Sequence, residues 1–120
     1  MVVDDETDLL AIISRVLSGN GLKVHPFSNP ELAIQHFKDD CTECKIVISD
    51  LRMPSMSGFE LVMALKRLRP EVKIIFMTAF RTNREEVQLI LPNIQIDAFL
   101  NKPFRSMDLM QALADCKESQ

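Results

Sequence analysis

The sequence predicts an α/β fold, a doubly wound sheet of five parallel strands with helices on both faces, and three observations lead to it. Short apolar runs alternate along the chain with segments whose apolar residues recur at helical spacing. The runs are almost continuously apolar, which is typical of parallel strands covered on both faces. The length of 120 residues is enough for one compact core, so we expect a single domain over residues 1–120.

The first predicted strand is Met1–Val3, a short apolar run that leads into a pair of aspartates. Apolar residues then recur at helical spacing as far as residue 17, and Thr7 or Asp8 can cap the start of this helix. The Gly-Asn-Gly segment at residues 19–21 supplies the stop, since glycine commonly ends a helix. The first 21 residues therefore predict a strand followed by a helix.

A brief second strand is expected at Leu22–Pro26, followed by a second helix. Asn29 provides the cap of this helix, a proline and a glutamate follow in its first turn, and the apolar spacing extends to Phe37. The third strand is the β-branched run Ile46–Ile48, which ends at Ser49 and Asp50. Its composition is typical of a strand that is buried on both faces.

The next segments repeat the same alternation. A helical stripe runs through Gly58–Arg67, and Pro70 closes it. Val72–Met77 is nearly all apolar and predicts the fourth strand. A weaker helix is expected at Asn83–Leu91, and Pro92 should terminate it because proline cannot continue the backbone hydrogen-bond ladder.

The last pair of elements completes the pattern. Ile96–Leu100 predicts the fifth strand, and Ser106 is expected to cap a final helix with apolar residues on one face. The strands and helices therefore alternate without interruption, as a parallel sheet with helical crossovers requires.

Polar residues follow four of the predicted strands, at the point where each strand ends. These residues are Asp4 and Asp5, Asp50, Thr78, and Asn101 with Lys102. In an open parallel sheet, ligands bind outside the carboxyl ends of the strands. Three carboxylates gathered there would repel one another by roughly 3 to 4 kcal/mol per pair at an effective dielectric near 20. The sequence therefore predicts a cation at this edge.

Magnesium suits such a site, because it prefers hard oxygen ligands and typically uses one or two carboxylates together with phosphate oxygens. Lys102 would supply further positive charge. The arrangement fits phosphoryl transfer, in which the protein mainly positions groups and neutralises charge on the phosphoryl oxygens. Asp50 is the expected nucleophile, since it stands alone at its strand end while Asp4 and Asp5 are paired.

Four motifs in order resemble the receiver domains of two-component response regulators. They are Val2–Glu6, Ser49–Pro54 with Gly58, Met77–Ala79 and Leu100–Phe104. The similarity extends over essentially the whole chain. It implies the flavodoxin-like arrangement, with strand order 2-1-3-4-5.

The resemblance also implies a separate role for each of the acidic residues. Asp50 would be the phosphoacceptor, and Asp5 would bind Mg²⁺ directly while Asp4 binds it largely through water. The backbone carbonyl of Arg52 would complete the protein ligands. We therefore expect Asp4, Asp5, Asp50 and Arg52 as the metal site, with magnesium as the cofactor.

The remaining roles implied by the resemblance concern the phosphate and the switch. Lys102 would pair with Asp50 or its phosphate, and its bond to Pro103 is often cis in this family. The hydroxyl of Thr78 would bind a phosphate oxygen, and Phe99 would turn inward when Thr78 moves. Phe99 stands where receivers often have tyrosine, so the readout would be steric, without a hydroxyl hydrogen bond.

The expected partners are a sensor histidine kinase or a phosphotransfer protein. The resemblance also allows a homodimer through the face formed by the predicted helix Asn83–Leu91, the strand Ile96–Leu100 and the last helix. Residues 84–95 depart from the usual alanine-rich pattern, so the build of this face is open. Arg52 and Phe80 flank the expected entry path of water, and we hypothesise that their bulk slows hydrolysis of the phosphoaspartate.

Two other functions are weighed against this switch. A phosphorylation-independent interaction module would keep the fold without the chemistry, but the complete set of acidic residues and lysine argues against it. A hydrolase of the aspartyl-phosphatase kind should carry a second acid two residues after its nucleophile, where this chain has Arg52. We therefore expect a signalling domain that assists its own phosphorylation and dephosphorylation, not an enzyme.

Composition excludes several further classes. The net charge of −3 lacks the basic excess of a domain that contacts nucleic acid. No apolar stretch approaches the roughly 18 residues of a membrane span, and no export signal is evident, so a cytoplasmic location is expected.

Cys41 and Cys44 form a C-x-x-C pair, but a second pair of zinc ligands is missing, and we interpret them as loop residues. His25 and His36 are read as ordinary residues away from the predicted edge.

Overall fold

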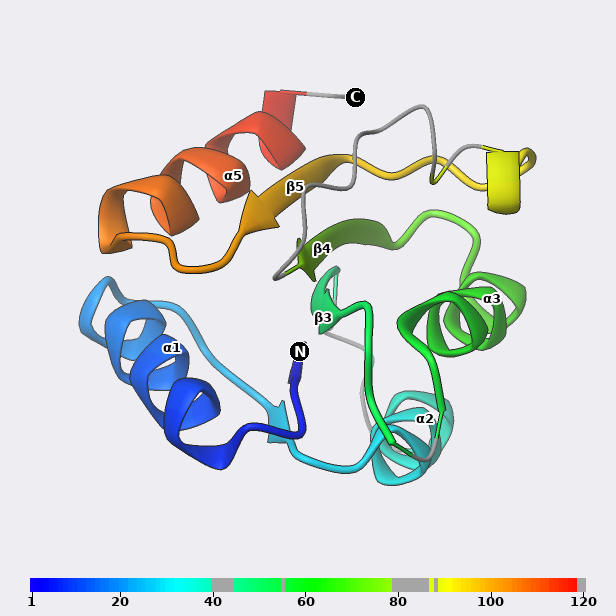
Figure 1. The fold of residues 1–120 in the computed structure, drawn as a ribbon, viewed down its shortest axis with the longest axis horizontal. Coiled ribbons are helices and arrows are strands. Elements are labelled where there is room, and N and C mark those ends of the chain that lie inside the picture. Colours follow the sequence, from blue (N-terminus) through cyan, green and yellow to red (C-terminus); the bar gives the residue numbers. More distant parts are fainter. Residues whose placement is uncertain (40–44, 55, 79–86, 88, 119–120) are drawn as a thin grey trace.

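Figure 1 shows the computed structural model of the chain, which describes residues 1–39, 45–54, 56–78, 87 and 89–118. Its helices and strands are β1 (Val2–Val3), α1 (Thr7–Gly19), β2 (Pro26–Phe27), α2 (Pro30–Asp39), β3 (Ile46–Asp50), α3 (Gly58–Leu68), β4 (Lys73–Thr78), β5 (Ala98–Asn101) and α5 (Ser106–Glu118). Residues 87, 89 and 90 are also helical and belong to the predicted helix Asn83–Leu91. Residues 83–86 and 88 of that helix lie outside the described part of the chain.

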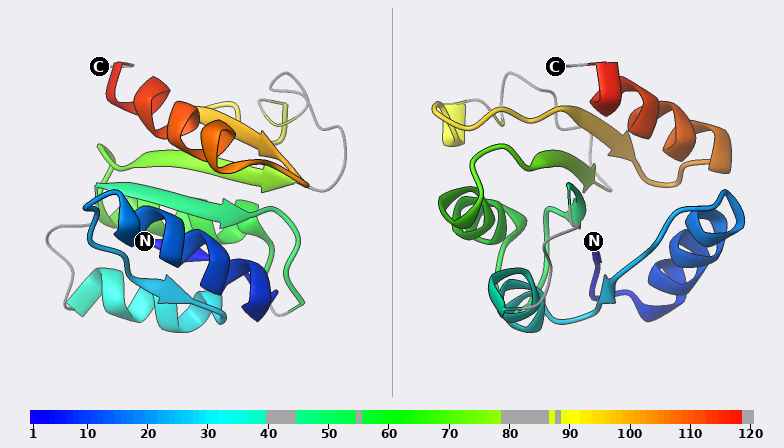
Figure 2. Two further views of the ribbon diagram at one scale, coloured as in Figure 1. Left: turned by 90° about the vertical axis from the view of Figure 1, so that its left-hand side faces the viewer. Right: turned by 180° about the vertical axis from the view of Figure 1, so that it is seen from behind.

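The strands form one parallel sheet in the order β2-β1-β3-β4-β5, which confirms the predicted fold and strand order. Val3 pairs with Ser49, Asp50 pairs with Met77, and Thr78 pairs with Asn101. Figure 2 shows α1 and α5 on one face of the sheet and α2 and α3 on the other. This register brings the carboxyl ends of β1, β3, β4 and β5 to one edge.

The sheet separates two hydrophobic layers, because successive side chains of a strand point to opposite faces. Val47, Ile74 and Phe76 pack with α2 and α3. Ile48 and Ile75, which alternate with them along β3 and β4, pack with α1 and α5. The continuous apolar runs of the sequence therefore reflect strands that fill two cores at once. Among the described helices, none combines the length and the apolar character needed to cross a bilayer.

The second strand begins later than predicted. The sequence indicated Leu22–Pro26, whereas β2 is Pro26–Phe27. A strand is defined by its ladder of hydrogen bonds. The amides of Val2, in β1, and of Asp4, directly after β1, donate to the carbonyls of His25 and Phe27. β2 is an edge strand, where proline is tolerated because its missing N–H is not needed on the outer side.

Helix capping is confirmed at one of the three predicted positions. The side chain of Asn29 accepts a hydrogen bond of 2.8 Å from the Glu31 amide, as expected. Helix α1 begins at Thr7 after Glu6, which makes no side-chain cap, so the prediction of a Thr7 or Asp8 cap was wrong.

The start of the last helix also differs from the prediction. Ser106 is the first residue of α5 and does not cap it. Instead, the carboxylate of Asp108 reaches back and accepts a hydrogen bond of 2.8 Å from the Arg105 amide. Arg105 thus occupies the N-cap position, its carbonyl accepts from the Asp108 and Leu109 amides, and Asp108 makes the reverse bond typical of a capping box.

Candidate functional site

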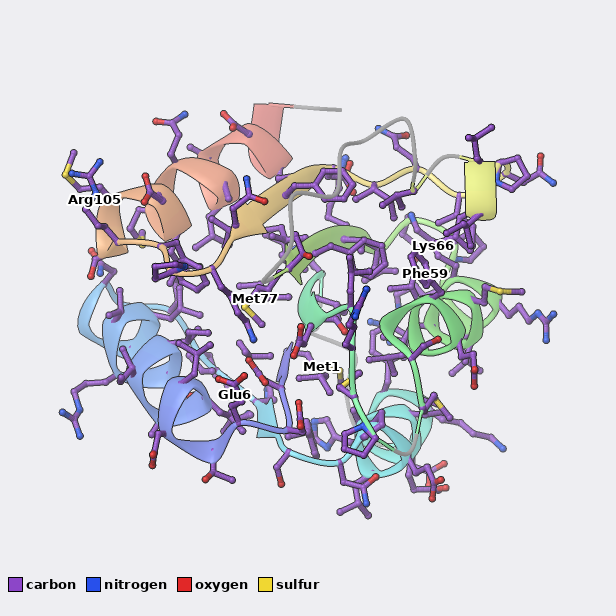
Figure 3. All side chains as sticks on the ribbon, in the orientation of Figure 1. Met1, Glu6, Phe59, Lys66, Met77 and Arg105 are labelled. Atoms are coloured by element: carbon purple, nitrogen blue, oxygen red, sulfur yellow. The ribbon has the colours of Figure 1, made fainter. Side chains whose placement is uncertain are left out.

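Three carboxylates converge at the carboxyl edge of the sheet. Asp4 and Asp5 follow β1, Asp50 ends β3, and their carboxylate oxygens all lie within 4.8 Å of one another. Asp4 is completely buried and Asp50 nearly so, whereas Asp5 is exposed. In Figure 3, Glu6 at the start of α1 and Met77 near the end of β4 mark the rim where this cluster lies. The prediction that residues distant in sequence meet here is thus confirmed in the geometry.

Lys102 provides the positive charge within this cluster. Its ammonium donates to the Oδ2 atoms of Asp4, at 3.1 Å, and Asp50, at 3.2 Å, and it lies 3.8 Å from a carboxylate oxygen of Glu6. The side chain of Lys102 is only 11% exposed, so solvent screens these interactions weakly. The Lys102–Pro103 peptide bond is cis, as the sequence comparison with receivers suggested. One ammonium therefore bridges two buried carboxylates.

Lys102 does not fully offset the effects that destabilise the ionised form of Asp50. Burial raises the pKa of Asp50, the nearby charge of Asp4 raises it further, and the charge and hydrogen bond of Lys102 oppose the rise without cancelling it. Burial alone would lower the pKa of Lys102, but its interactions with Asp4 and Asp50 together raise it. Lys102 is thus firmly charged, while Asp50 is still destabilised as an anion. A further cation at this edge would stabilise the ionised carboxylate.

The backbone around Asp50 holds its side chain at the rim. The amide of Leu51 donates to the Met77 carbonyl at 3.0 Å, which continues the β3–β4 ladder past the end of the strand. The amide of Gly58 then donates to the Leu51 carbonyl at 2.9 Å, and the Ser57 side chain accepts from Glu60 and caps α3. The start of α3 is therefore fastened directly against the residue after Asp50.

Thr78 and Arg52 complete the opening. Asp5, Glu6, Asp50, Leu51, Arg52, Thr78 and Lys102 line a pocket of about 210 Å³. Thr78 is buried at the end of β4, and its carbonyl accepts a hydrogen bond of 2.7 Å from the Lys102 amide. Every residue predicted for catalysis or metal binding either lines this pocket or, in the case of Asp4, contacts a residue that does.

Phe99 lies apart from the pocket. It is half-buried on β5, and its ring centroid is 6.2 Å from that of Phe76 in β4. Its side chain packs against the hydrophobic layer that lies between the sheet and the helices α2 and α3, on the face opposite α5. The ring is therefore positioned beside the site, two strands' width from Asp50 in the sheet order, with β4 between them.

Other candidates are not brought to the site. The rings of His25 and His36 lie 4.8 Å from each other near β2 and α2, as expected for residues away from this edge. Cys116 belongs to α5 and is buried in the layer between this helix and the sheet. Cys41, Cys44 and Phe80 lie outside the described residues, so the interpretations given to them stay predictions.

The sequence interpretation assigned no role to Glu6 or Asp97. Glu6 is the third acidic residue near Lys102, and its position directly after Asp4 and Asp5 was the available signal. Asp97 is buried at the other end of β5, where its carboxylate accepts a hydrogen bond of 2.8 Å from the Ile74 amide. A lone acid at the start of an apolar run was the signal for Asp97.

The cluster fits a magnesium ion. Carboxylate oxygens from Asp4, Asp5 and Asp50 approach one another closely enough to share one ion. They are hard oxygen donors, and the exposure of Asp5 gives access from solvent. Burial and the charge of Asp4 raise the pKa of Asp50 despite Lys102, so a cation bound here would stabilise the ionised carboxylate.

Comparison with known proteins agrees with this geometry. Residues 1–114 match the protein-family model described as the response regulator receiver domain. The chain is 31% identical over 116 residues to the response regulator protein TmoT of Ectopseudomonas mendocina, which covers 93% of this chain and 49% of TmoT. The chain spans about half the length of the curated relatives it matches.

Solved structures show the same fold. The response regulator receiver domain protein from Clostridium thermocellum has a TM-score of 0.84 and 26% identity, over 98% of this chain and 91% of that one. The response regulator protein TrrA of Thermotoga maritima, solved in complex with Mg(2+)-BeF, has a TM-score of 0.80 and 25% identity. The match to TrrA covers 96% of this chain and 95% of the TrrA chain.

Proposed function

This chain belongs to the family of response regulator receiver domains, and we propose that it works as a magnesium-dependent phosphorylation switch with Asp50 as the phosphoacceptor. Receiver domains are signalling domains of two-component systems, and an acidic cluster such as Asp4, Asp5 and Asp50 fits a phosphoacceptor site. The observation that carries the proposal is the ammonium of Lys102, held between Asp4 and Asp50 at 3.1 and 3.2 Å.

The phosphoryl donor in this proposal is a histidine kinase or a phosphotransfer protein. An oxygen of the Asp50 carboxylate attacks the phosphorus, the bond from phosphorus to the donor histidine nitrogen breaks, and an acyl phosphate forms. Lys102 is already beside the attacked position, so it neutralises negative charge on the phosphoryl group as the new bond forms. The hydroxyl of Thr78, at the edge of the same pocket, binds a phosphoryl oxygen.

Asp4, Asp5, Asp50 and the backbone carbonyl of Arg52 would hold the magnesium ion. When bound, Mg²⁺ supplies charge neutralisation for the carboxylates and the phosphoryl oxygens. Asp5 is exposed and suited to direct binding, whereas Asp4 is buried and already accepts from the Glu6 amide and from Lys102. This difference supports a water-mediated role for Asp4 and a direct one for Asp5.

The switch would run from Thr78 to the face made by β5 and α5. A move of Thr78 toward the phosphate opens space near the end of β4, and Phe99 then turns inward from the neighbouring strand. Phe99 has no hydroxyl, so its turn changes the shape of the surface and adds no hydrogen bond. The domain would act in the cytoplasm as a single unit, and a second copy is one partner to be tested on this face.

The direct test is phosphorylation by a small-molecule donor. Mass spectrometry after treatment with acetyl phosphate and Mg²⁺ should show the gain of one phosphoryl group on Asp50. Asp50→Asn should abolish this gain, whereas Asp8→Asn, an exposed acid in the first turn of α1, should leave it intact. An unmodified chain under these conditions would instead favour the phosphorylation-independent interaction module.

A further inference from the structure

We propose that His25 and His36 form a second metal site, for a transition-metal ion of the Zn²⁺, Ni²⁺ and Cu²⁺ class, which ties the edge strand β2 to helix α2. The ring centroids of the two histidines lie 4.8 Å apart, with an angle of 39° between the ring planes. The residues come from separate elements, so only the fold brings them together. The site lies apart from the acidic cluster, and the inference does not depend on the proposed function.

The spacing of the two rings fits a shared ion. Imidazole nitrogens bind Zn²⁺ at about 2.0–2.1 Å, so two imidazoles on one tetrahedral ion have ring centroids roughly 5 Å apart. The observed separation of 4.8 Å is close to this value. Each imidazole gives one nitrogen to the ion, and its other nitrogen stays available for a neighbouring protein group, as is usual for metal-binding histidine. The pair therefore supplies part of the coordination shell, and water completes it.

The backbone fixes both histidines in place. His25 directly precedes β2, and its carbonyl accepts a hydrogen bond of 3.0 Å from the Val2 amide, which joins this point of the chain to β1. His36 lies in the last turn of α2, and α2 packs beside β2 at the edge of the sheet (Figure 1 and Figure 2). Both histidine side chains are half-buried, so an ion can reach them from solvent.

The surroundings of His36 suit a cation. The C-terminal end of a helix carries partial negative charge, which favours a positive ion there. Asp39 adds a carboxylate on the same side of α2, since residues three apart are neighbours on a helix, whereas Lys38, two residues away, faces another side. The ring of Phe27 lies 5.2 Å from that of His36 and forms an apolar wall beside the pair.

The imidazoles select a different ion from the acidic cluster. Imidazole suits Zn²⁺, Ni²⁺ and Cu²⁺, whereas Mg²⁺ prefers oxygen ligands such as the carboxylates at the carboxyl edge of the sheet. The strand β2 has only two residues, so an ion held by His25 and His36 would add a crosslink where the sheet has a short edge. An ion that binds the folded chain and not the unfolded chain stabilises the fold by mass action.

The test is a titration of the 120-residue chain with ZnCl₂, followed through the ring C–H signals of the two histidines. Both sets of ring signals should shift together and saturate, and MgCl₂ should leave them unchanged. His25→Phe and His36→Phe keep an aromatic ring without a nitrogen ligand, and each should weaken Zn²⁺ binding at this site by at least about tenfold. Zn²⁺ should raise the midpoint of thermal unfolding more for the unmodified chain than for either variant.

The matched control is Lys38→Gln, which changes an exposed residue in the same turn of α2 and should bind Zn²⁺ as the unmodified chain does. Cysteine thiolates bind the same ions, so the titration is repeated with the double variant Cys41→Ser with Cys44→Ser, in which the ring shifts should persist. Cys41 and Cys44 lie outside the described residues, and the site is assigned to the imidazoles alone.

Three results would overturn the inference: ring signals that stay fixed in a large excess of Zn²⁺, ring shifts that vanish in the double cysteine variant, or undiminished Zn²⁺ binding in both phenylalanine variants. Asp50 is unchanged in every arm of this experiment. Failure of acetyl phosphate labelling would therefore count against the proposed function and leave the metal site separate.

Discussion

Gly58 lies directly against the backbone of Asp50. A Cβ atom at residue 58 would be 2.3 Å from the Asp50 carbonyl oxygen and 2.9 Å from the Cα of Leu51. Such distances are far inside van der Waals contact, and the opposing atoms belong to the backbone. Gly58 is thus required by close approach at the start of α3, beside the phosphoacceptor.

Gly58→Ala should therefore disturb both stability and the site. We expect the free energy of unfolding to fall by about 1 to 3 kcal/mol, because the added methyl group overpacks a closed contact. Phosphorylation of Asp50 should slow as its backbone shifts. Urea denaturation and acetyl phosphate labelling measure the two effects. Gly19→Ala is the control, since a Cβ there meets nothing within 4 Å, and it should be neutral or slightly stabilising.

Lys102→Met should have opposite effects on metal binding and on phosphoryl transfer. The substitution removes the ammonium from between Asp4 and Asp50 and keeps much of the side-chain length. Mg²⁺ should bind more tightly, since a competing cation is gone, while acetyl phosphate labelling of Asp50 should slow by roughly 100-fold or more. Calorimetric titration and timed mass spectrometry give the two readings. Parallel losses in both would contradict the role assigned to Lys102.

Arg52→Ala should shorten the life of the phosphorylated form. Arg52 is exposed and lines the pocket that opens onto Asp50, so its side chain stands in the expected path of water. The decay of the phosphoryl mass after removal of the donor measures hydrolysis. An unchanged half-life would rule out shielding by Arg52. Phe80, the second residue of this hypothesis, lies outside the described residues, and Phe80→Ala is an independent trial of it.

Asp97→Ala should weaken the attachment of β5. The Asp97 carboxylate accepts from the Ile74 amide at 2.8 Å, and the Asp97 amide donates to the Ile74 carbonyl at 2.9 Å. Removal of the carboxylate leaves a buried donor without its partner, which costs about 1 to 3 kcal/mol. Asp97→Asn retains a side-chain oxygen and should lose less. Denaturation of the two variants side by side makes the comparison, and equal losses would mean that the acceptor is unimportant.

The buried thiol of Cys116 should make the protein less stable to unfolding in alkaline solution. Burial raises the pKa of its thiol from 9.0 to about 11. Between these values the thiol of the unfolded chain loses its proton while that of the folded chain keeps it. Stability from this group is complete below pH 9 and falls as the pH rises toward 11. Cys116→Ala should show a shallower decline over this range, and thermal unfolding at several pH values tests it.

The sequence was sufficient for the fold because its strands carry continuous apolar runs and its polar residues follow them. Asp50 and Lys102 could be placed at one edge from the rule that parallel strands end on the same side. The start of β2 could not be predicted in the same way, because the ladder depends on which carbonyls the amides of Val2 and Asp4 reach. Here they reach His25 and Phe27, and local composition does not encode that choice.

Contacts between distant residues were the other limit. Asp97 and Ile74 are 23 residues apart, and nothing near either residue announces their hydrogen bond. The cap of α5 failed as a prediction for a local reason, since Ser106 and Asp108 both suit a helix start and only the geometry distinguishes them. Sequence patterns thus identified the residues of the site, whereas the hydrogen bonds that hold the chain in place were visible only in the structure.

The alternation of β3 between the two hydrophobic layers has a consequence for changes in chain length. Val47 and Ile48 face opposite cores, and Asp50 ends the same strand. Deleting or inserting one residue inside Ile46–Asp50 would make every later side chain of this strand point to the opposite face of the sheet. The phosphoacceptor would then lie on the wrong face. Lineages of this protein should therefore accumulate indels in the connecting segments and keep this strand at constant length.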